Sequence, residues 1–530
     1  MAFNSILIVG GGSAGWMAAA TLIKKFPNKK ITLVESADVP KIGVGESTLA
    51  FIRDWTAYLG IDDKDFIKHT NGTYKLSIKF TDFYDKDYGG FHYPFGNPSE
   101  IDDINYNDWQ LKKAYYPETH SSDFAENFWP TMALVNENKL STNEDGSFDD
   151  FRFDYDTAFH FDSLLFGKYL KDHYCIPRGV NHIIGTVKET PVDDNGISKI
   201  VLEDGTQLQA DLYVDCSGFE SLLLGKALKE PFVSYRDILP NNKAWAVQVP
   251  YTDKEKELEV YTNCTALTNG WVWNIPLWSR LGTGYVYSDE FISDEEALQE
   301  FKDHLNSDKM TVHNPNRVTD ELNFRHINFR TGIHERIWVK NVLAIGLSAA
   351  FIEPLESNGL LSVHEFLLEF CRHVDRPVIN QFDRDVYNAR IRRFYQNFAD
   401  FVALHYALSI RSDSNYWIKN RARVYDPDIG NSHSGFNDLY VKKTDTLRHF
   451  GKAGIVCIAN GMNYNIYTEV DIVKDELGRQ VNQREFCERF LYNRRNKMNQ
   501  WKTAAKSQLS AYDWLDQHIY NSSKDNNTND

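Results

Sequence analysis

The chain has 530 residues, of which 42% are hydrophobic and 25% charged, a composition typical of a soluble globular enzyme. This length is enough for two or three domain-sized units, or for one large core with an added lobe. The formal net charge of −16 excludes a general nucleic-acid binder, because the chain has no basic surplus to neutralise phosphates.

The cysteines and the apolar segments indicate the compartment. Six cysteines are scattered without a CxxC pair, which is typical of reduced thiols in a reducing compartment and gives no metal-site spacing. No segment approaches about 18 consecutive apolar residues, and the first residues lack the pattern of a signal peptide. We therefore expect a cytoplasmic protein that does not enter a membrane, and a homo-oligomer is compatible with these features.

The first pattern along the chain is strand, glycine turn, helix and strand. Residues 5–9 form an apolar run typical of a strand that is buried on both faces, and residues 10–15 are rich in glycine. A helix is predicted over residues 16–25 and a second buried strand over residues 30–35. The chain therefore begins with a βαβ unit.

Beyond this unit the chain changes character several times. Residues 84–150 are rich in Gly, Pro, Asp, Asn and Tyr, and predict a long aromatic-rich excursion of the kind that covers a substrate. Residues 178–215 predict a β-meander, and a late buried strand is predicted at 342–345. The chain after residue 376 is predicted to be mostly helical, with a long charged helix near 478–517.

The glycine turn carries a nucleotide-binding pattern. Gly10, Gly12 and Gly15 fit GxGxxG, and Glu35 closes the second strand twenty residues later. The first glycine permits a tight turn, the second allows a pyrophosphate to approach, and the third lets the helix pack closely on the strand. The helix N-terminus offers N–H groups to phosphate, and Glu35 can accept hydrogen bonds from ribose hydroxyls. The residues predicted to contact the nucleotide are Gly10, Gly12, Ser13, Ala14, Gly15 and Glu35.

FAD is favoured over NAD because a second apolar strand ending in glycine, at residues 342–346, follows hundreds of residues later, as in large FAD-box flavoproteins. We therefore expect an α/β fold. Its FAD-binding Rossmann-like box with the β-meander spans residues 1–375, including the excursion at about 84–150. A mainly helical C-terminal substrate lobe follows over residues 376–520, and residues 521–530 are predicted to be disordered.

Three motifs carry a resemblance to a known family. Residues 10–18 read GGGSAGWMA, residues 43–48 read GVGEST and residues 271–276 read WVWNIP. They resemble the flavin-dependent tryptophan halogenase family, for which WxWxIP is diagnostic. Further stretches agree in the expected order, so that the likeness runs from residue 5 to about 420. The positions of the diagnostic motif are Trp271, Trp273, Ile275 and Pro276.

The resemblance implies an oxidoreductase with FAD, as FADH2, and a halide ion. Reduced FAD comes from a separate flavin reductase and acts with oxygen and halide to form hypohalous acid. This acid passes through an internal tunnel to a lysine beside a small aromatic substrate, where a carboxylate assists electrophilic halogenation by chloride- or bromide-derived oxidant. The tryptophans of the motif would block ordinary monooxygenation, and the site would exclude water.

Two positions match the catalytic residues of the family. The lysine matches Lys75, and in a strand Lys75, Ser77 and Lys79 would share one face. An inward-facing Lys75 with a depressed pKa could act as a nucleophilic amine, whereas Lys79 is expected to be a structural cation. The carboxylate matches Glu356, for which the alternative is a cap on the helix predicted over residues 360–373.

The resemblance also assigns the remaining contacts. Halide is expected at the backbone N–H groups of Asn358 and Gly359, just before a helix whose N-terminus favours anions. The family commonly has threonine at the position of Asn358. Residues assigned to the surroundings of the substrate are Tyr93, Pro94, Phe95 and Ser357. Further cofactor contacts are assigned to Gly45, Glu46, Val187, Leu347 and Leu360.

The likeness fails where the family binds free tryptophan. The sequence lacks the residues that clamp the amino acid in the family, namely a glutamate, a Phe-Trp pair, an asparagine and neighbouring tyrosines. Residues 448–463 resemble that region only weakly. Tyr93 stands where the family has histidine. We therefore expect an indole or a phenol-like aromatic in a more open site, and not free tryptophan alone.

Two other classes of protein remain open at this point. A single-component FAD aromatic monooxygenase would bind NAD(P)H itself, but the late strand ends in Gly346-Leu347-Ser348 without the aspartate of its GD motif. A non-catalytic FAD-fold binding protein would keep the glycine turn, but it has no need for Lys75, Glu356 and the tryptophan motif together.

Overall fold

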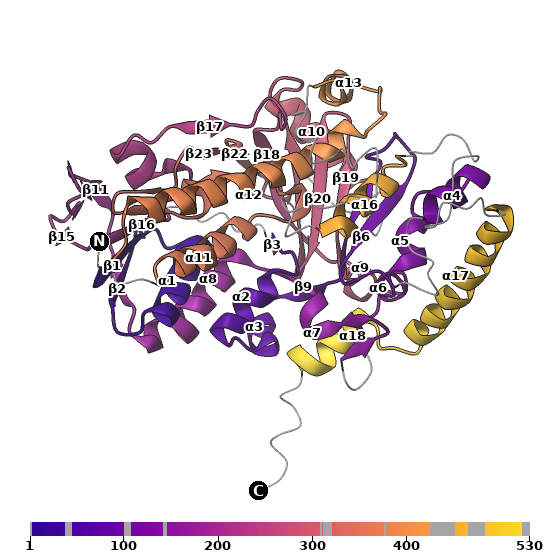
Figure 1. Ribbon diagram of the computed structural model, residues 1–530, viewed down its shortest axis with the longest axis horizontal. Helices are drawn as coiled ribbons and strands as arrows, with labels where there is room; N and C mark the ends of the chain where they lie inside the picture. Colours follow the sequence, from indigo (N-terminus) through magenta and orange to yellow (C-terminus); the bar gives the residue numbers. More distant parts are fainter. Residues whose placement is uncertain are drawn as a thin grey trace, which may run out of the picture.

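The N-terminal part of the protein is built on a six-stranded sheet with the order β10-β2-β1-β16-β25-β24 (Figure 1). The computed structural model describes residues 3–37, 45–99, 108–140, 146–307, 310, 321–375, 378–423, 451–464 and 483–521. All neighbouring strands of this sheet are parallel except β24 and β25. The strands are β1 (Ser5–Val9), β2 (Lys30–Glu35), β10 (Asn181–Ile184), β16 (Leu212–Asp215), β24 (Trp338–Val339) and β25 (Val342–Ala344).

The predicted βαβ unit is confirmed and forms the centre of this sheet. β1 and β2 have the predicted bounds, and α1 (Ser13–Lys25) connects them. The helix begins at Ser13 and not at residue 16, because the last residues of the glycine turn already form its first turn. Residues 15–23 are all buried, and α1 packs against α11 (Leu361–His373). α1 also packs on β1 and β2, and the buried pattern of both strands is typical of a parallel sheet.

A seven-stranded sheet carries the tryptophan motif. Its order is β22-β18-β21-β20-β19-β5-β6, and all neighbours are antiparallel except β5 and β19. The motif lies on β20, an interior strand whose seven residues are all buried. The strands are β5 (Ser77–Thr81), β6 (Gly90–Pro94), β18 (Lys243–Pro250), β19 (Tyr261–Ala266), β20 (Gly270–Pro276), β21 (Arg280–Tyr287) and β22 (Arg325–Asn328).

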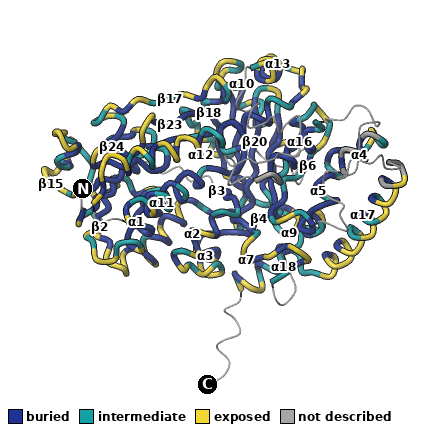
Figure 2. Tube along the Cα trace, in the orientation of Figure 1, coloured by how far each residue is buried: buried dark blue, intermediate teal, exposed yellow. Residues whose placement is uncertain are grey.

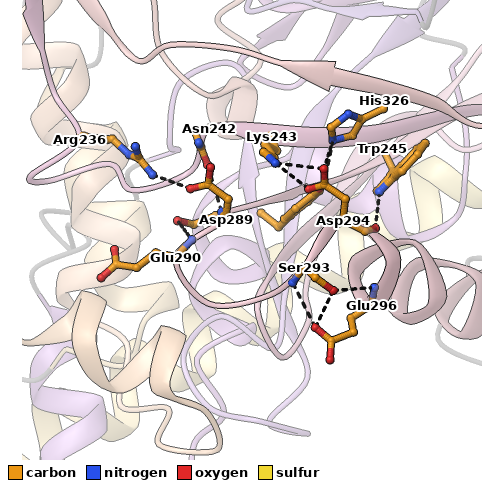
Figure 3. Close-up of polar contacts among 12 residues, drawn as sticks. Arg236, Asn242, Lys243, Trp245, Asp289, Glu290, Ser293, Asp294, Glu296 and His326 are labelled. Carbon is orange, nitrogen blue, oxygen red and sulfur yellow. Dashed lines mark hydrogen bonds and ion pairs between the residues drawn. The ribbon is translucent and has the colours of Figure 1, made fainter.

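Polar contacts fix the start of α10 (Asp294–Leu305) to this sheet (Figure 3). Ser293 and Glu296 form a capping box, in which each side chain accepts from the other residue's backbone N–H. Lys243 Nζ lies 2.8 Å from a carboxylate oxygen of Asp294, and Trp245 donates its indole N–H to the Asp294 carbonyl at 2.9 Å. Both partners lie on β18, so the helix is held over the sheet, where its apolar side chains form a small second core.

Helices make up the described chain after residue 380, as predicted. The predicted single helix near 478–517 is in fact interrupted, because Ser510 Oγ accepts from the Asp513 N–H and starts a new helix. The helices are α12 (Gln381–Ala407), α13 (Asn415–Arg421), α16 (Gly451–Gly461), α17 (Gln483–Lys506), α18 (Ala511–Leu515) and the π-helix η9 (Asp516–Tyr520).

The excursion at 84–150 contains more regular structure than its composition predicts. Beside β6 and the short β7 (Ser147–Phe148) it includes three helices, and α17 packs against all three of them at one end of the molecule (Figure 1). Each helix has only six to eight residues, too few for a helical period to show in the sequence. The helices are α4 (Asp108–Tyr115), α5 (Asp123–Phe128) and α6 (Thr131–Asn136).

Buried apolar side chains form one large core that runs through the middle of the molecule (Figure 2). It extends in sequence from Phe3 to Ile519 and therefore includes elements on both sides of residue 375. The division into a box and a lobe at that residue stays a prediction. Residues 522–530, predicted to be disordered, lie outside the described residues.

The cysteines and helices agree with two expectations from the sequence. All six cysteines are buried, and none of them forms a disulfide. Within the described ranges, no helix is both long enough and apolar enough to cross a bilayer.

Candidate active site

A cavity of about 850 Å³ opens at the carboxyl ends of β1, β2 and β16 and extends to the wall of the seven-stranded sheet. Ligands of α/β proteins commonly bind at this edge of a parallel sheet. Ten of the predicted cofactor-binding residues line it: Gly10, Gly12, Ser13, Ala14, Glu35, Gly45, Glu46, Val187, Leu347 and Leu360.

The glycine turn shapes one end of this cavity. Gly10 has a φ of +113°, and a Cβ there would lie 2.2 Å from the carbonyl oxygen of Cys216. Gly15 lies behind the cavity wall, where a Cβ would come within 1.9 Å of the Gly10 carbonyl oxygen. A Cβ at Gly12 would meet no atom within 4 Å, and α1 begins at Ser13 without a side-chain cap. Open space and available N–H groups fit the pyrophosphate of a dinucleotide.

Glu35 closes β2 beside the glycine turn. Its side chain is buried, and its Oε1 lies 2.9 Å from Nε2 of His182. His182 lies on β10, the parallel neighbour of β2, and no sequence pattern pointed to it. The predicted acceptor of ribose hydroxyls is therefore held in place by an imidazole from the adjacent strand.

Glu46 lies between the cofactor cavity and the predicted halide position. It belongs to β3 (Glu46–Ser47), and a Cβ on Gly359 would lie 3.1 Å from its Oε2. Burial and repulsion from Asp162 raise the pKa of Glu46 to about 7. A carboxyl group with this pKa is partly protonated near neutrality, which reduces its repulsion of an anion.

Lys75 is completely buried, and its ammonium group is held by two oxygen atoms. Nζ donates to the Thr48 carbonyl oxygen at 3.0 Å and to Ser357 Oγ at 2.7 Å. Burial lowers the pKa of Lys75 to about 7, although Cys264 and Glu356 oppose this shift. An amine with this pKa exists in both protonation states near neutral pH, as the prediction of a reactive lysine requires.

The strand that carries Lys75 differs from the expectation. Instead of one strand, β4 (Thr73–Lys75) pairs with β9 (Ala158–Phe161), whereas β5 joins the seven-stranded sheet. Leu76 lies at the change of sheet and donates its N–H to the Val260 carbonyl. Lys75 therefore does not share a sheet face with Ser77 and Lys79, and the change of sheet leaves Lys75 buried and Lys79 partly exposed.

Glu356 is also completely buried, in direct contact with a histidine. It ends the 3-10 turn η7 (Pro354–Glu356), and its Oε1 lies 3.0 Å from Nε2 of His405 on α12. Burial raises the pKa of Glu356, whereas His405 and Lys75 lower it. The imidazole ring packs on Phe80 with a distance of 4.6 Å between ring centres. His405 and Lys75 thus both favour the ionised form of this carboxylate.

The turn from Ser357 to Gly359 leads from Glu356 into α11. Ser357 adopts a left-handed conformation with a φ of +56°, and Asn358 donates its side-chain N–H to the Ile352 carbonyl at 3.1 Å. Gly359 and Ser357 line the cavity, whereas Asn358 does not. The backbone N–H groups of Asn358 and Gly359 donate to no other described residue. Because α11 has no side-chain cap, the alternative that Glu356 caps it is wrong.

Three of the four predicted substrate residues lie at or just after the end of β6, and the fourth, Ser357, lies in the turn described above. The Phe95 ring centre is 5.1 Å from Lys75 Nζ, and the Tyr93 ring centre is 6.3 Å from that of Phe95. Burial, together with the nearby carboxylate of Glu356, raises the pKa of Tyr93 well above its ordinary value, so Tyr93 stays protonated. Pro94 ends β6 between these two rings. The aromatic pair and the two catalytic candidates therefore surround one region.

α16 packs against β6 next to this region. Cys457 Sγ lies 3.2 Å from the His92 carbonyl oxygen, and Gly461 allows the helix to pack directly on the Phe91 ring. Residues 454–464 contain no charged side chain. This segment belongs to the part predicted to depart from the tryptophan clamp, and residues 448–450 lie outside the described residues.

The two tryptophans of the WxWxIP motif have different surroundings. Trp273 and Ile275 line the cofactor cavity, whereas Trp271 does not. Trp271 donates its indole N–H to Oε2 of the buried Glu353 at 3.1 Å. The carbonyl oxygen of Pro276 accepts a hydrogen bond from Thr73 on β4 at 2.7 Å. The motif therefore supplies a wall of the cavity and two ties to neighbouring elements.

Comparisons with known proteins agree with this geometry. The family model described as tryptophan halogenase matches residues 5–465. Tryptophan 6-halogenase SttH from Streptomyces toxytricini is 33% identical over 79% of this chain and 81% of its own length. Tryptophan 7-halogenase RebH from Lentzea aerocolonigenes is 33% identical over 79% of each chain.

Solved structures extend the likeness to the whole chain. The apo structure of VirX1 has a TM-score of 0.88 and 35% identity, and covers 98% of this chain and 99% of its own. Xcc4156, a flavin-dependent halogenase from Xanthomonas campestris, has a TM-score of 0.84 and 25% identity, with coverage of 98% and 99%. The chain belongs to the tryptophan halogenase family, whose members are flavin-dependent enzymes that use reduced FAD and halide.

Proposed function

We propose that this enzyme halogenates an indole or phenol-like aromatic through Lys75 and Glu356, and that free tryptophan is not its only substrate. The observation that carries the proposal is the buried contact of Lys75 with Ser357, which lines the cofactor cavity. Glu356 directly precedes Ser357 in the chain. An oxidant made in the cavity would thus meet an amine and a carboxylate that are both shielded from water.

The roles of the two catalytic candidates follow from their surroundings. Because its pKa of about 7 keeps both forms populated, the protonated Lys75 Nζ can donate a hydrogen bond to a hypohalous acid that reaches Ser357. The neutral amine can instead attack the halogen of that acid, so that an N–halogen bond forms, the O–halogen bond breaks and water leaves. Glu356, next to His405, can accept the proton that leaves the aromatic ring when the halogen is added. Phe95, beside Lys75, would present an apolar face to the substrate ring.

The cavity supplies the cofactor site in this proposal. The glycine turn and the N-terminus of α1 would hold the pyrophosphate, and Glu35 would accept from the ribose. Trp273 and Ile275 would cover the ring system on the side of the seven-stranded sheet. Reduced FAD bound there supplies the oxidising chemistry with oxygen and halide. Asn358 and Gly359 would bind the halide through their backbone N–H groups.

The choice of substrate rests on the uncharged side chains of the part of α16 that packs against β6. A free amino acid carries an ammonium and a carboxylate group, and buried charges need partners of opposite sign. Residues 454–464 carry no charged side chain. This composition favours an aromatic without a charged backbone. We also propose that a separate flavin reductase delivers the reduced FAD.

A halogenation assay tests this function. The purified protein is given FAD reduced by a reductase, each halide in turn, and a panel of indoles, phenols and tryptophan, with products identified by mass spectrometry. Halogenated indoles or phenols are expected in larger amount than halogenated tryptophan. Rapid regioselective turnover of free tryptophan alone would contradict the substrate assignment, and a hydroxylated product would indicate a monooxygenase instead.

Two lysine variants separate catalysis from folding. Lys75→Met should abolish halogen incorporation while FAD still binds, because Lys75 itself does not line the cavity. Lys79→Met, at a partly exposed position three residues beyond the change of sheet at Leu76, should keep the activity. Undiminished halogenation by Lys75→Met would refute the role of this lysine.

A further inference from the structure

Glu46 differs from the other acids of the site because its carboxyl group has no partner in the described part of the chain. It lies on β3 and lines the cavity, yet no described residue forms a hydrogen bond or an ion pair with its side chain. Glu35, by contrast, has His182 at 2.9 Å, and Glu356 has His405 at 3.0 Å. An acid without such a partner is costly to ionise inside a protein. This carboxyl group is therefore available to a ligand or a proton.

The side chain of Glu46 lies against the predicted halide position. A Cβ added to Gly359 would lie 3.1 Å from Oε2 of Glu46, so a methyl group there would fill the gap between the two residues. Gly359 also lines the cavity, and its backbone N–H, like that of Asn358, donates to no other described residue. A halide held by these N–H groups would have the Glu46 carboxyl group as its neighbour.

The protonation state of Glu46 determines how this neighbour acts on an anion. An ionised carboxylate repels a halide beside it, and the repulsion is strong where bulk water does not screen it. A protonated carboxyl group is neutral and can donate its O–H to the halide, as a third donor beside the two N–H groups. The same side chain thus either completes the anion site or blocks it.

We propose that Glu46 couples halide binding to the uptake of one proton, so that the halide binds beside Gly359 while the carboxyl group is protonated and is excluded when the group is ionised. This inference rests on the proposed halide position at the N–H groups of Asn358 and Gly359. Halide and proton then enter this part of the cavity together, without a change in its net charge. Only the O–H bond of the carboxyl group is made or broken.

The groups around Glu46 place its titration in the neutral range. Burial, together with repulsion from Asp162, raises the pKa of Glu46 to about 7. Asp162 follows directly after β9, and Arg280 weakens its repulsion because the guanidinium lies 2.7 Å from the Asp162 carboxylate. His160 on β9, the strand paired with β3, stays neutral because burial and the charge of Lys75 hold its pKa well below its ordinary value.

Two further titratable groups lie close to the same turn. Lys75 Nζ donates to Ser357 Oγ at 2.7 Å, and with a pKa of about 7 this amine loses its positive charge in the same pH range. Loss of that charge would also weaken the binding of an anion. Glu356 precedes Ser357, and its pKa is raised by burial and lowered by His405 and Lys75. A test therefore has to separate Glu46 from Lys75.

Chlorine NMR measures the coupling without turnover. The width of the chloride resonance in the presence of the FAD-loaded protein, followed over a chloride titration at each pH, gives the affinity of the site. In the unaltered protein the affinity should fall roughly tenfold between pH 6 and pH 8, because the carboxyl group changes from mainly protonated to mainly ionised. Glu46→Gln keeps the shape and a donor but cannot ionise, so its chloride affinity should change little over this range.

Two matched variants assign the effect to this residue and to this position. Lys75→Met removes the other group that titrates near pH 7, and it should retain the fall in affinity. Gly359→Ala places a methyl group against Glu46 and should abolish the pH-dependent broadening of the chloride resonance. Flavin fluorescence and thermal unfolding show whether each variant is loaded with FAD and folded.

The outcomes separate this inference from the proposed function. A chloride affinity that is equal at pH 6 and pH 8 in the unaltered protein, or a fall that Glu46→Gln retains, overturns the coupling. Unchanged broadening in Gly359→Ala overturns the halide position and the coupling with it. The expected profile in a protein that forms no halogenated product would support the coupling and overturn only the proposed reaction.

Discussion

His405 presents its Nε2 3.0 Å from the Glu356 carboxylate, and neither side chain is exposed to solvent. The two residues lie 49 positions apart, one in a turn of the cofactor-binding part and the other near the end of the 27-residue helix α12. Without a partner, a carboxylate at this depth would stay protonated near neutral pH. The contact therefore lowers the pKa of Glu356 against the effect of burial and favours the ionised form, which can accept a proton.

Replacement of His405 by phenylalanine should shift the pH dependence of halogenation upward. The pKa of Glu356 is raised by burial and lowered by His405, so loss of the imidazole raises it further. A higher pKa means a smaller ionised fraction at any given pH, and the activity that needs the carboxylate is lost from the acidic side. A shift of the acidic side of the profile by about one unit is expected, which lowers kcat by up to about tenfold on that side.

The pH–rate profile with saturating FAD and substrate checks this prediction. Phenylalanine is suited to the site because His405 already packs among the rings of Phe80, Phe83 and Phe401. Replacement of His304, a buried histidine on α10, by glutamine serves as the control and should leave the profile unchanged. Equal profiles for the His405 variant and the unaltered protein would show that the contact has no role in proton transfer.

Features that depend on neighbouring residues in the sequence could be predicted, whereas features that depend on contacts between distant segments could not. The βαβ unit could be predicted because its signals are local: apolar runs, three glycines at fixed spacing and an acid at the end of β2. Lys75 and Glu356 were found only through the family motifs, since nothing in their own neighbourhoods distinguishes them. The structure adds the reason for their burial, namely the change of sheet at Leu76 and the turn at Ser357.

The partners of these residues could not be predicted from spacing. His182 and His405 reach Glu35 and Glu356 from elements that only the folded chain brings together. A histidine in a strand or helix is most often a core residue. The helices of the excursion are local elements, but the sequence does not predict them because they are too short to show a helical period.

Replacement of Lys75 by methionine should make the protein more stable while it abolishes activity. The pKa of Lys75 falls from the ordinary 10.5 to about 7 in the folded chain, so the unfolded chain binds more protons between these two values. The buried lysine therefore costs stability that is regained as the pH rises toward 10.5, and the full cost applies below pH 7. Lost hydrogen bonds offset part of the gain, which should be roughly 2–4 kcal/mol.

Urea denaturation of the apo protein at pH 6.5 and pH 9.5 measures this effect. The stabilisation by Lys75→Met should be larger at the lower pH. Lys79→Met, at a partly exposed position of β5, should change the stability little at either pH. A destabilised Lys75→Met variant at pH 6.5 would show that the contacts with Thr48 and Ser357 outweigh the cost of burial.

The two tryptophans of the motif should respond differently to replacement by phenylalanine. Trp271→Phe removes a donor to the buried Glu353, whose remaining partners are Asn241 and Tyr406, and should lower the free energy of unfolding by about 1–3 kcal/mol. The indole N–H of Trp273 has no hydrogen-bond partner in the described part of the chain, and its ring lines the cofactor cavity. Trp273→Phe should therefore change FAD affinity more than stability.

Denaturation curves and FAD titrations on the two variants, carried out in parallel, check this division. If both variants lost the same stability and bound FAD equally well, the prediction would be wrong, and both tryptophans would have only a structural role in the core. The same experiment tests the ring packing of Trp273, which depends on Gly284, where a Cβ would lie 2.2 Å from the indole.

Alanine at Gly12 and alanine at Gly15 should separate cofactor binding from folding. A Cβ at Gly12 meets no atom of the protein, and its φ of −74° suits any residue, so Gly12→Ala should fold with nearly unchanged stability. The added methyl group projects where the pyrophosphate would approach, and FAD affinity should fall at least tenfold. Gly15→Ala instead places a Cβ 1.9 Å from the Gly10 carbonyl oxygen and should destabilise the chain by several kcal/mol, about 2–4. Flavin fluorescence quenching and thermal unfolding measure the two effects, and a Gly12→Ala variant that binds FAD normally would place the pyrophosphate elsewhere in the cavity.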